Sequence, residues 1–159
     1  MSKPLSISII TPSLNQGKFI ERTIQSVLQQ NVNIPVEYIV VDGGSTDGTL
    51  DILQKYSERI KWISEPDRGQ SDALNKGISM ASGEIIGYLN SDDIYLPGTL
   101  QKVEDQFAMH PETNWVYGMA KMIDDNDEDI RKWISRYKRK RSASFNYNRL
   151  LVENYISQP

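Results

Sequence analysis

The chain has 159 residues, no cysteine and a formal net charge of −3, and its composition is 38% hydrophobic and 25% charged. This length fits one domain that buries a core of its own, and the lack of cysteine excludes disulfides, thiolate metal sites and a thiol nucleophile. The mildly acidic charge argues against nucleic acid as a partner, because non-specific binding to phosphates relies on a net positive field.

The first half of the chain alternates predicted strands with predicted helices. An apolar, β-rich run at residues 6–11 predicts a strand that stops at Pro12, and residues 18–30 carry apolar side chains at helical spacing. The same pattern then repeats, with a strand over 38–41, a helix over 49–60 and a short strand over 61–64.

The second half continues the alternation, with a helix over 71–83, a strand over 85–89, a helix over 99–110 and a strand over 114–123. Strands that alternate with helices and are apolar on both faces are typical of a parallel sheet covered by helices. We therefore predict an α/β fold with a mostly parallel sheet flanked by helices.

The pattern weakens after Ile123. The acidic run "DDNDED" predicts the turn of a hairpin that returns through "IRKWIS", and a short helix is expected over 147–152. Between them lies the basic run "RYKRKR" at residues 136–141. This run is either a solvated surface segment or a contact for an anionic acceptor or for a membrane surface that bears anionic lipid.

The sequence shows no membrane-spanning or secretory segment. No stretch approaches the ~20 apolar residues that a spanning helix needs, and the N-terminus lacks the uninterrupted apolar region of a signal peptide. We expect a cytoplasmic protein, with peripheral association at the inner face of the membrane as the alternative.

Compact polar residues follow three of the predicted strands. In open α/β sheets, ligands bind outside the carboxyl ends of the strands, and glycines let a ligand approach the backbone. The sequence therefore predicts a binding site here, although tight turns and helix caps would use the same residue types. The residues are Thr11, Pro12, Ser13 and Asn15 after the first strand, Asp42, Gly43, Gly44, Ser45 and Asp47 after the second, and Asn90, Ser91, Asp92 and Asp93 after the fourth.

These segments match no standard phosphate loop. "DGGSTDGT" fails the G-x-G-x-x-G spacing and contains no G-K-[ST], so it is neither a dinucleotide fingerprint nor a P-loop. A nucleotidyltransferase would need a basic, glycine-rich loop after the first strand, where "TPSLNQGKF" offers one glycine and one lysine. With one histidine and no cysteine, zinc chemistry and Ser-His-Asp catalysis have little support.

Two adjacent acids, Asp92 and Asp93, end the apolar strand at 85–89. Neighbouring carboxylates repel each other and resist burial unless a positive charge lies beside them. Mg²⁺ and Mn²⁺ bind one or two carboxylates together with phosphate oxygens, so the pair predicts a metal–diphosphate site, with a helix cap as the alternative. Arg68 beside Gly69 could bind a phosphate, for which a guanidinium is well shaped; the alternative is a solvated loop.

Five segments in order resemble family 2 glycosyltransferases with the GT-A fold. They are "SIITPSLNQGKFIERTIQSVLQQ", "YIVVDGGSTDGT", "ISEPDRGQSDALNKGI", "GEIIGYLNSDDIYLPG" and "VYGMAKMID". The resemblance covers residues 6–123, with a weaker continuation through "NYISQP". It implies a Rossmann-like nucleotide-sugar site in this part of the chain.

The resemblance also implies roles for individual residues. Thr11 and Pro12 would line the nucleoside pocket, Asp42 would hydrogen-bond the base, and residues 68–72 would lie near the diphosphate or the base. Asp92 and Asp93 would hold Mn²⁺ or Mg²⁺ at the position of the family's D-x-D motif. The full set expected to bind a nucleotide sugar, with a UDP-sugar favoured, is Thr11, Pro12, Ser13, Asn15, Asp42, Gly44, Arg68, Gly69, Asp72, Asn75, Asn90, Ser91 and Asp92.

Two features depart from the family pattern. Asn90 replaces the first acid of D-x-D and brings no charge. The general base of this family comes from a later, acceptor-binding half, and the pairs Glu104/Asp105 and Glu128/Asp129 are poor substitutes. We therefore expect a single glycosyltransferase domain over 1–159, with residues 1–123 binding the nucleotide sugar and residues 124–159 beginning an incomplete acceptor-binding part.

The expected activity is metal-assisted, inverting sugar transfer to a carbohydrate or lipid-linked acceptor, with no nucleic acid as partner. The non-enzymatic alternative is a nucleotide-binding module without turnover. Apolar surface left exposed on the acceptor side would also favour self-association.

Overall fold

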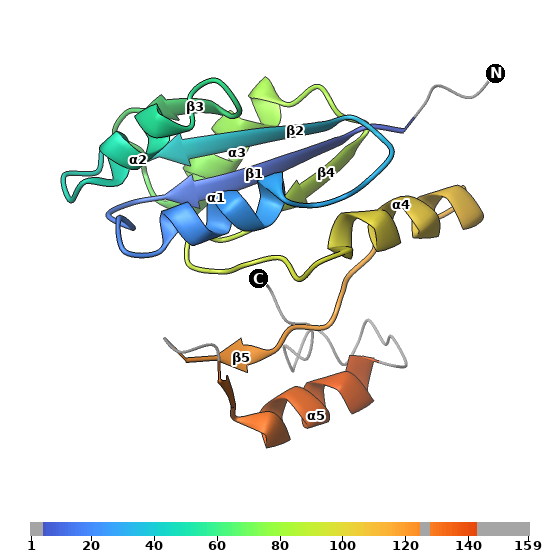
Figure 1. The fold of residues 1–159 in the computed structure, drawn as a ribbon. Coiled ribbons are helices and arrows are strands. Elements are labelled where there is room, and N and C mark those ends of the chain that lie inside the picture. The colour runs from blue at the N-terminus through green and yellow to red at the C-terminus, as the bar shows by residue number, and fades with distance from the viewer. Residues whose placement is uncertain (1–4, 125–127, 143–159) are drawn as a thin grey trace. The chain divides into compact units, whose positions relative to one another are not determined.

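The computed structural model describes residues 5–124 and 128–142. The chain forms two compact units, Met1–Glu112 and Thr113–Pro159 (Figure 1). Within these residues, no helix is long and apolar enough to cross a membrane.

The first unit is built on a four-stranded parallel sheet. Its strands are β1 (Ile7–Ser13), β2 (Val36–Asp42), β3 (Lys61–Ser64) and β4 (Ile85–Tyr88), in the order β3-β2-β1-β4. All three pairings are parallel. The predicted α/β architecture with a parallel sheet is therefore confirmed.

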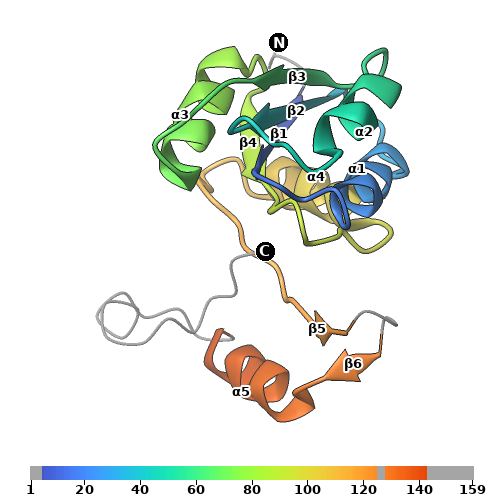
Figure 2. The same ribbon diagram turned by 90° about the vertical axis from the view of Figure 1, so that its left-hand side faces the viewer.

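Helices cover both faces of this sheet (Figure 2). On one face lie α1 (Ile20–Leu28), α2 (Thr49–Lys55) and α4 (Thr99–Met109), whose buried side chains pack in one cluster with Ile7 and Ile9 of β1. On the other face lies α3 (Gln70–Met80), where Ala73 packs with residues of β2. The apolar spacing that predicted α1 thus corresponds to its buried face.

Strand β1 extends two residues beyond its predicted end and includes Pro12. The carbonyl of Ile10 accepts the N–H of Leu89 on the β4 side, so the backbone of Pro12, two residues later, points to the same side. Pairing with β4 ends at Ile10 and Tyr88. Pro12 therefore sits where no partner strand requires an N–H donor, which is the condition under which a strand tolerates proline.

Helix α3 packs very close to the sheet at Gly77. A Cβ atom at this position would lie 2.4 Å from Cγ2 of Ile10. The absence of a side chain therefore sets the distance between α3 and β1, and with it the position of the N-terminus of α3.

Glu37 links the start of β2 to both neighbouring strands and to the segment that follows α3. Its carboxylate accepts hydrogen bonds from the Ser8 hydroxyl, the Lys61 ammonium, and the N–H and hydroxyl of Ser82. Burial raises the pKa of Glu37, but the hydrogen bonds from Lys61, Ser8 and Ser82 outweigh it and lower the pKa to about 2.

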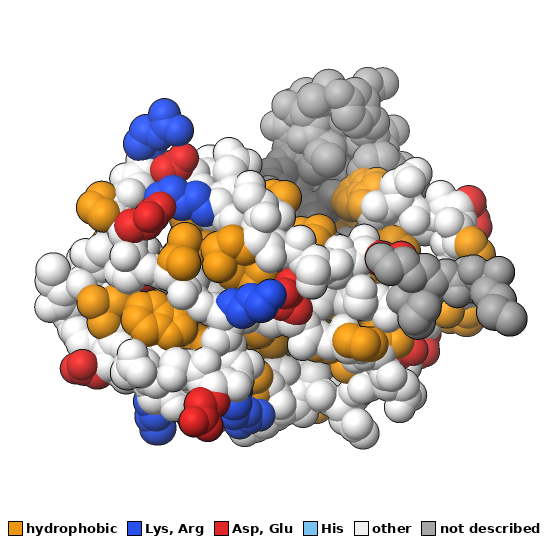
Figure 3. Space-filling model, turned by 90° about the horizontal axis from the view of Figure 1, so that it is seen from above, with side chains coloured by type: hydrophobic (Ala, Val, Ile, Leu, Met, Phe, Trp, Pro, Cys, Tyr) orange, Lys and Arg blue, Asp and Glu red, His pale blue; other side chains and the backbone are white. Residues whose placement is uncertain are grey.

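Several charged side chains on the first unit pair with a side chain of opposite charge. Figure 3 shows Lys and Arg side chains beside Asp or Glu side chains on the face that it presents. Examples are Lys55 with Glu21 at 2.5 Å and Lys76 with Glu65 at 2.8 Å. Ion pairs at the surface add little stability each.

The second unit contains the short antiparallel strands β5 (Met122–Ile123) and β6 (Asp129–Ile130), followed by α5 (Lys132–Ser142). The expected hairpin is present, but two predictions were wrong. The strand expected over 114–123 is confined to Met122–Ile123, and the arm expected through "IRKWIS" ends at Ile130. Arg131 has φ 50°, which breaks the strand before α5 begins. The basic run therefore lies on a helix, and the helix expected over 147–152 lies outside the described residues.

Candidate functional site

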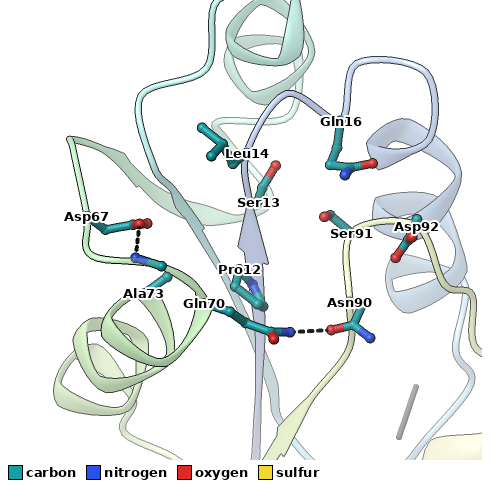
Figure 4. A pocket seen from close by; sticks show the side chains of 11 residues that line it. Pro12, Ser13, Leu14, Gln16, Asp67, Gln70, Ala73, Asn90, Ser91 and Asp92 are labelled. Carbon is teal, nitrogen blue, oxygen red and sulfur yellow. Dashed lines mark hydrogen bonds between the residues drawn. The ribbon is translucent and has the colours of Figure 1, made fainter.

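A pocket of about 340 Å³ opens at the carboxyl ends of β1 and β4 (Figure 4). Beyond Ile10 and Tyr88 these two strands no longer pair. In the sheet, β2 and β3 lie on one side of β1, and β4 lies on the other side. This is the switch point of the sheet order, where open α/β sheets bind ligands. The lining residues are Pro12, Ser13, Leu14, Gln16, Asp67, Gly69, Gln70, Ala73, Asn90, Ser91 and Asp92.

Ser13 lies at the end of β1 and presents an unused polar group. The residue is 5% exposed, and its hydroxyl has no hydrogen-bond partner among the described residues. A buried hydroxyl without a partner is costly in a finished core. Its place in the pocket wall is consistent with a hydrogen bond to a ligand.

The loops after β1 and β2 are tied to each other by hydrogen bonds. The N–H of Asn15 donates to the Ser45 hydroxyl at 2.7 Å, and its side-chain oxygen accepts the N–H of Thr46 at 2.9 Å. The N–H of Gly17 donates to the Asp47 carboxylate at 2.9 Å. Asn15, which has φ 53°, therefore fixes the rim of the pocket from behind and is not one of its lining residues.

Asp42 is completely buried, and its carboxylate is saturated from within the protein. It accepts the N–H groups of Gly44 at 3.0 Å and Ser45 at 2.8 Å, the hydroxyl of Ser45, and the hydroxyl of Ser64 at 2.7 Å. Thr11 is also fully buried, and its hydroxyl pairs with the Tyr38 hydroxyl at 2.9 Å. Neither Thr11, Asp42 nor Gly44 lines the pocket. These three residues instead stabilise the ends of β1 and β2, next to the residues that line the pocket.

The loop before α3 supplies one wall of the pocket. Gly69, at φ 105°, donates its N–H to the Asp67 carboxylate at 2.8 Å and precedes the helix. Arg68 is 90% exposed and pairs with Asp72 at 3.1 Å. That hydrogen bond is the main reason why the pKa of Asp72 is lowered. Asn75 is exposed on α3, and Arg68, Asp72 and Asn75 are not among the lining residues.

The turn at residues 90–93 forms the opposite wall, and α1 holds it in place. The Thr23 hydroxyl, fully buried, contacts the carbonyl oxygens of Ser91 at 2.9 Å and Asp93 at 2.8 Å. One turn further along α1, the Ser26 hydroxyl accepts the N–H of Tyr95 at 3.1 Å. Two small polar side chains of a helix therefore set the path of the acidic segment.

The acidic pair is split between two environments. Asp92 is exposed and lines the pocket, whereas Asp93 is half-buried and accepts a hydrogen bond from the Asn90 amide at 3.2 Å. Burial is the main cause that raises the pKa of Asp93, and the neighbouring charge of Asp92 adds to it. A cation beside the pair would lower the pKa of Asp93 and thus oppose both effects.

The described residues contain no group of three or more His, Cys, Asp or Glu side chains that could enclose a metal ion. A fully protein-bound metal is therefore not expected within them. The two adjacent carboxylates do fit a hard divalent cation that takes its remaining ligands from phosphate oxygens and water. Asp92 at the pocket surface and Asp93 behind it are the residues that could hold one.

Several lining residues were not predicted from the sequence, namely Leu14, Gln16, Asp67 and Ala73. Gln70 lies in the segment 68–72 that was expected near the diphosphate or the base, but its partner was not predicted: it donates to the Asn90 amide oxygen at 2.7 Å. The available signal was position, because these residues directly follow β1 or flank the start of α3. Their residue types alone did not indicate a binding site.

Comparison with known proteins places this geometry in a family. A model of "Glycosyl transferase family 2" matches residues 8–156. A glycosyltransferase of Nostoc sp., alr2836, is 34% identical over 133 residues, which are 79% of this chain and 40% of that protein. The chain thus spans less than half the length of this curated relative.

Solved structures agree in fold. TarS of S. aureus in complex with UDP-GlcNAc has a TM-score of 0.60 and 28% identity, over 67% of this chain and 32% of that one. Glucosyl-3-phosphoglycerate synthase of Mycobacterium tuberculosis, in complex with Mn²⁺, UDP and phosphoglyceric acid, has a TM-score of 0.52 and 27% identity, over 62% and 37%. With a parallel sheet of the GT-A type and a family match that spans residues 8–156, the chain belongs to glycosyl transferase family 2.

Proposed function

We propose that this chain is the donor-binding part of a glycosyltransferase that moves a sugar from a nucleoside-diphosphate sugar to an acceptor hydroxyl. The observation that carries the proposal is the pocket at the split between β1 and β4, with the exposed Asp92 in its wall. A UDP-sugar is favoured as donor. Supporting this choice, TarS was solved with UDP-GlcNAc and the M. tuberculosis synthase with UDP and Mn²⁺.

In this proposal the donor contacts come from both walls of the pocket. Pro12, Ser13 and Gly69 would contact the nucleoside or diphosphate, and Asn90, Ser91 and Asp92 would contact the ribose, the diphosphate and its metal. The other candidates act through the pocket's shape or charge. Thr11, Asn15, Asp42 and Gly44 would support the strand ends. Arg68 in the loop before α3, with Asp72 and Asn75 on the helix, would contribute charge and polar groups beside the pocket.

Asp92, with Asp93 behind it, would hold Mn²⁺ or Mg²⁺ against the diphosphate. When bound, such an ion neutralises the charge that collects on the departing nucleoside diphosphate. The protein's own residues hold the two carboxylates in place. Thr23 fixes the backbone of the turn, Asn90 fixes the Asp93 carboxylate, and Asp92 is left exposed in the pocket wall.

The acceptor hydroxyl would attack the anomeric carbon from the face opposite the diphosphate, which inverts its configuration, while a carboxylate removes the proton. We assign no catalytic base among the candidate residues. Glu104 and Asp105 on α4 both accept hydrogen bonds from Gln101 at 2.9 Å and lie outside the pocket. We propose a carbohydrate or lipid-linked acceptor bound by a part of the enzyme beyond this site.

Calorimetric titration of UDP, GDP and dTDP, with Mn²⁺ and then with EDTA, tests the donor site. The proposal predicts metal-dependent binding of one nucleotide, UDP first. Binding without sugar transfer would favour a nucleotide-binding module without turnover. No binding of any nucleotide to the folded protein would refute the donor site.

We further propose that the protein is cytoplasmic and associates peripherally with membranes through α5. This helix carries six cations and no acid, and its Trp133 is 73% exposed. Basic helices with an exposed aromatic side chain favour surfaces that bear anionic lipid.

Exposed apolar side chains in the same unit, such as Ile130, would also support self-association. A concentration series in sedimentation tests for self-association.

A further inference from the structure

A chain of two hydrogen bonds runs from α3 to the acidic turn at residues 90–93. The Gln70 amide nitrogen donates to the Asn90 amide oxygen at 2.7 Å (Figure 4). The Asn90 amide nitrogen in turn donates to the Asp93 carboxylate at 3.2 Å. Gln70 is the first residue of α3, and Asn90 follows β4. The two walls of the pocket are therefore connected by side chains alone at this point.

The direction of this chain is determined by its last member. An ionised carboxylate such as that of Asp93 only accepts hydrogen bonds, so Asn90 must turn its nitrogen toward it. The amide oxygen of Asn90 then faces Gln70, which must donate. This arrangement pairs a donor with an acceptor in both hydrogen bonds. If the amide of Gln70 or of Asn90 were rotated by 180°, two acceptor oxygens would face each other.

The same geometry gives a reason for an amide at position 90. A carboxylate there would lie within hydrogen-bonding distance of Asp93, next to the charge of Asp92, and could not donate to either. Asn90 supplies the donor that Asp93 needs and adds no third negative charge. The family's first acid is thus replaced by a residue that binds its neighbour.

We propose that Gln70 is a positioning residue that acts through Asn90 to hold the turn at residues 90–93 in its ligand-binding conformation before a ligand arrives. The inference rests on the proposed function, because the ligand in question is a metal-bound nucleoside diphosphate. Gln70 sets the Asn90 amide, Asn90 sets the Asp93 carboxylate, and Asp92 is left free to face the pocket.

The direction of the chain makes replacement of Gln70 by two different residues informative. Gln70→Ala removes the donor and leaves the Asn90 oxygen to water. Gln70→Glu keeps the size but offers only acceptors, so Asn90 turns its nitrogen toward the new carboxylate and its oxygen toward Asp93. Gln70→Glu should therefore disturb the turn more than Gln70→Ala does.

A double-mutant cycle in UDP binding with Mn²⁺ tests this coupling by calorimetry. One hydrogen bond of ordinary strength corresponds to about fivefold in affinity, so Gln70→Ala and Asn90→Ala should each weaken binding by about that factor or more. The double variant should be no weaker than Asn90→Ala alone. Gln70→Glu should bind more weakly than Gln70→Ala, whereas the control Gln54→Glu, on the exposed surface of α2, should bind like the wild type.

Additive losses in the double variant, or equal affinities of Gln70→Glu and Gln70→Ala, would overturn the proposal. A ligand-free measurement separates this result from a failure of the proposed function. In the nuclear magnetic resonance spectrum of the unliganded protein, the Asn90 side-chain amide should shift in Gln70→Ala and Gln70→Glu but not in Gln54→Glu. An unchanged Asn90 signal would refute the coupling even if UDP binds, and a changed signal without UDP binding would refute only the donor site.

Discussion

Replacement of Thr23 by valine should destabilise the acidic turn without disturbing the core. The two side chains have nearly the same shape, so the change removes a hydroxyl and leaves the packing of α1 intact. That hydroxyl contacts the carbonyl oxygens of Ser91 and Asp93 at 2.9 and 2.8 Å, and Thr23 is fully buried. A buried polar group left without its partner costs about 1–3 kcal/mol, and one proton is shared between two acceptors here, so we expect a loss of ~2 kcal/mol.

The same change should weaken UDP binding in the presence of Mn²⁺, because the apparent dissociation constant rises as the fraction of protein with a competent turn falls. Urea unfolding followed by circular dichroism measures the stability, with an unchanged slope expected, and calorimetry measures the affinity. Thr23→Ser, which keeps the hydroxyl, should retain the affinity. If Thr23→Val unfolds at the wild-type urea concentration and binds UDP as tightly, the proposed role of this hydroxyl is wrong.

Three further predictions concern the scaffold and the second unit. The lowered pKa of Glu37, about 2 in the folded protein against 4.5 ordinarily, means that its contribution to stability is present above pH 4.5 and is lost as the pH falls toward 2; Glu37→Gln should flatten the pH dependence of urea unfolding in that window, and an unchanged profile would contradict the assignment. Gly77→Ala should destabilise the protein by about 1–3 kcal/mol through the clash with Ile10, measured by urea unfolding, and a neutral effect would show that α3 moves freely. The double variant Arg136→Glu and Lys140→Glu on α5 should bind vesicles containing anionic lipid more weakly than the wild type in co-sedimentation, and equal binding would rule out α5 as the contact.

The sequence predicted the parallel sheet and its helices well because their signals are local. Apolar residues at helical spacing identified α1, and short apolar runs before polar turns identified the strands. The second unit was predicted less well. Basic residues around Trp133 carry no clear period, and nothing in the residue types announced that Arg131 would adopt a left-handed conformation and end β6.

The candidate site was likewise predicted only in part. Polar residues after strands pointed to the edge of the sheet at which the pocket opens, because parallel strands end together. Which of them line the pocket depends on tertiary contacts that the sequence does not display. Asp42 turns inward to bind Ser45 and Ser64, and Gln70 reaches Asn90, twenty positions away, only after α3 has packed on the sheet.

We propose above that Asp92 holds a metal-bound nucleoside diphosphate in this pocket. Calorimetric titration of UDP with Mn²⁺ into Asp92→Ala, beside the control Glu58→Ala at an exposed site away from the pocket, tests it directly. We expect Glu58→Ala to bind UDP like the wild type and to lose binding in EDTA, whereas Asp92→Ala should show no metal-dependent binding. Wild-type affinity and metal dependence in Asp92→Ala would contradict it.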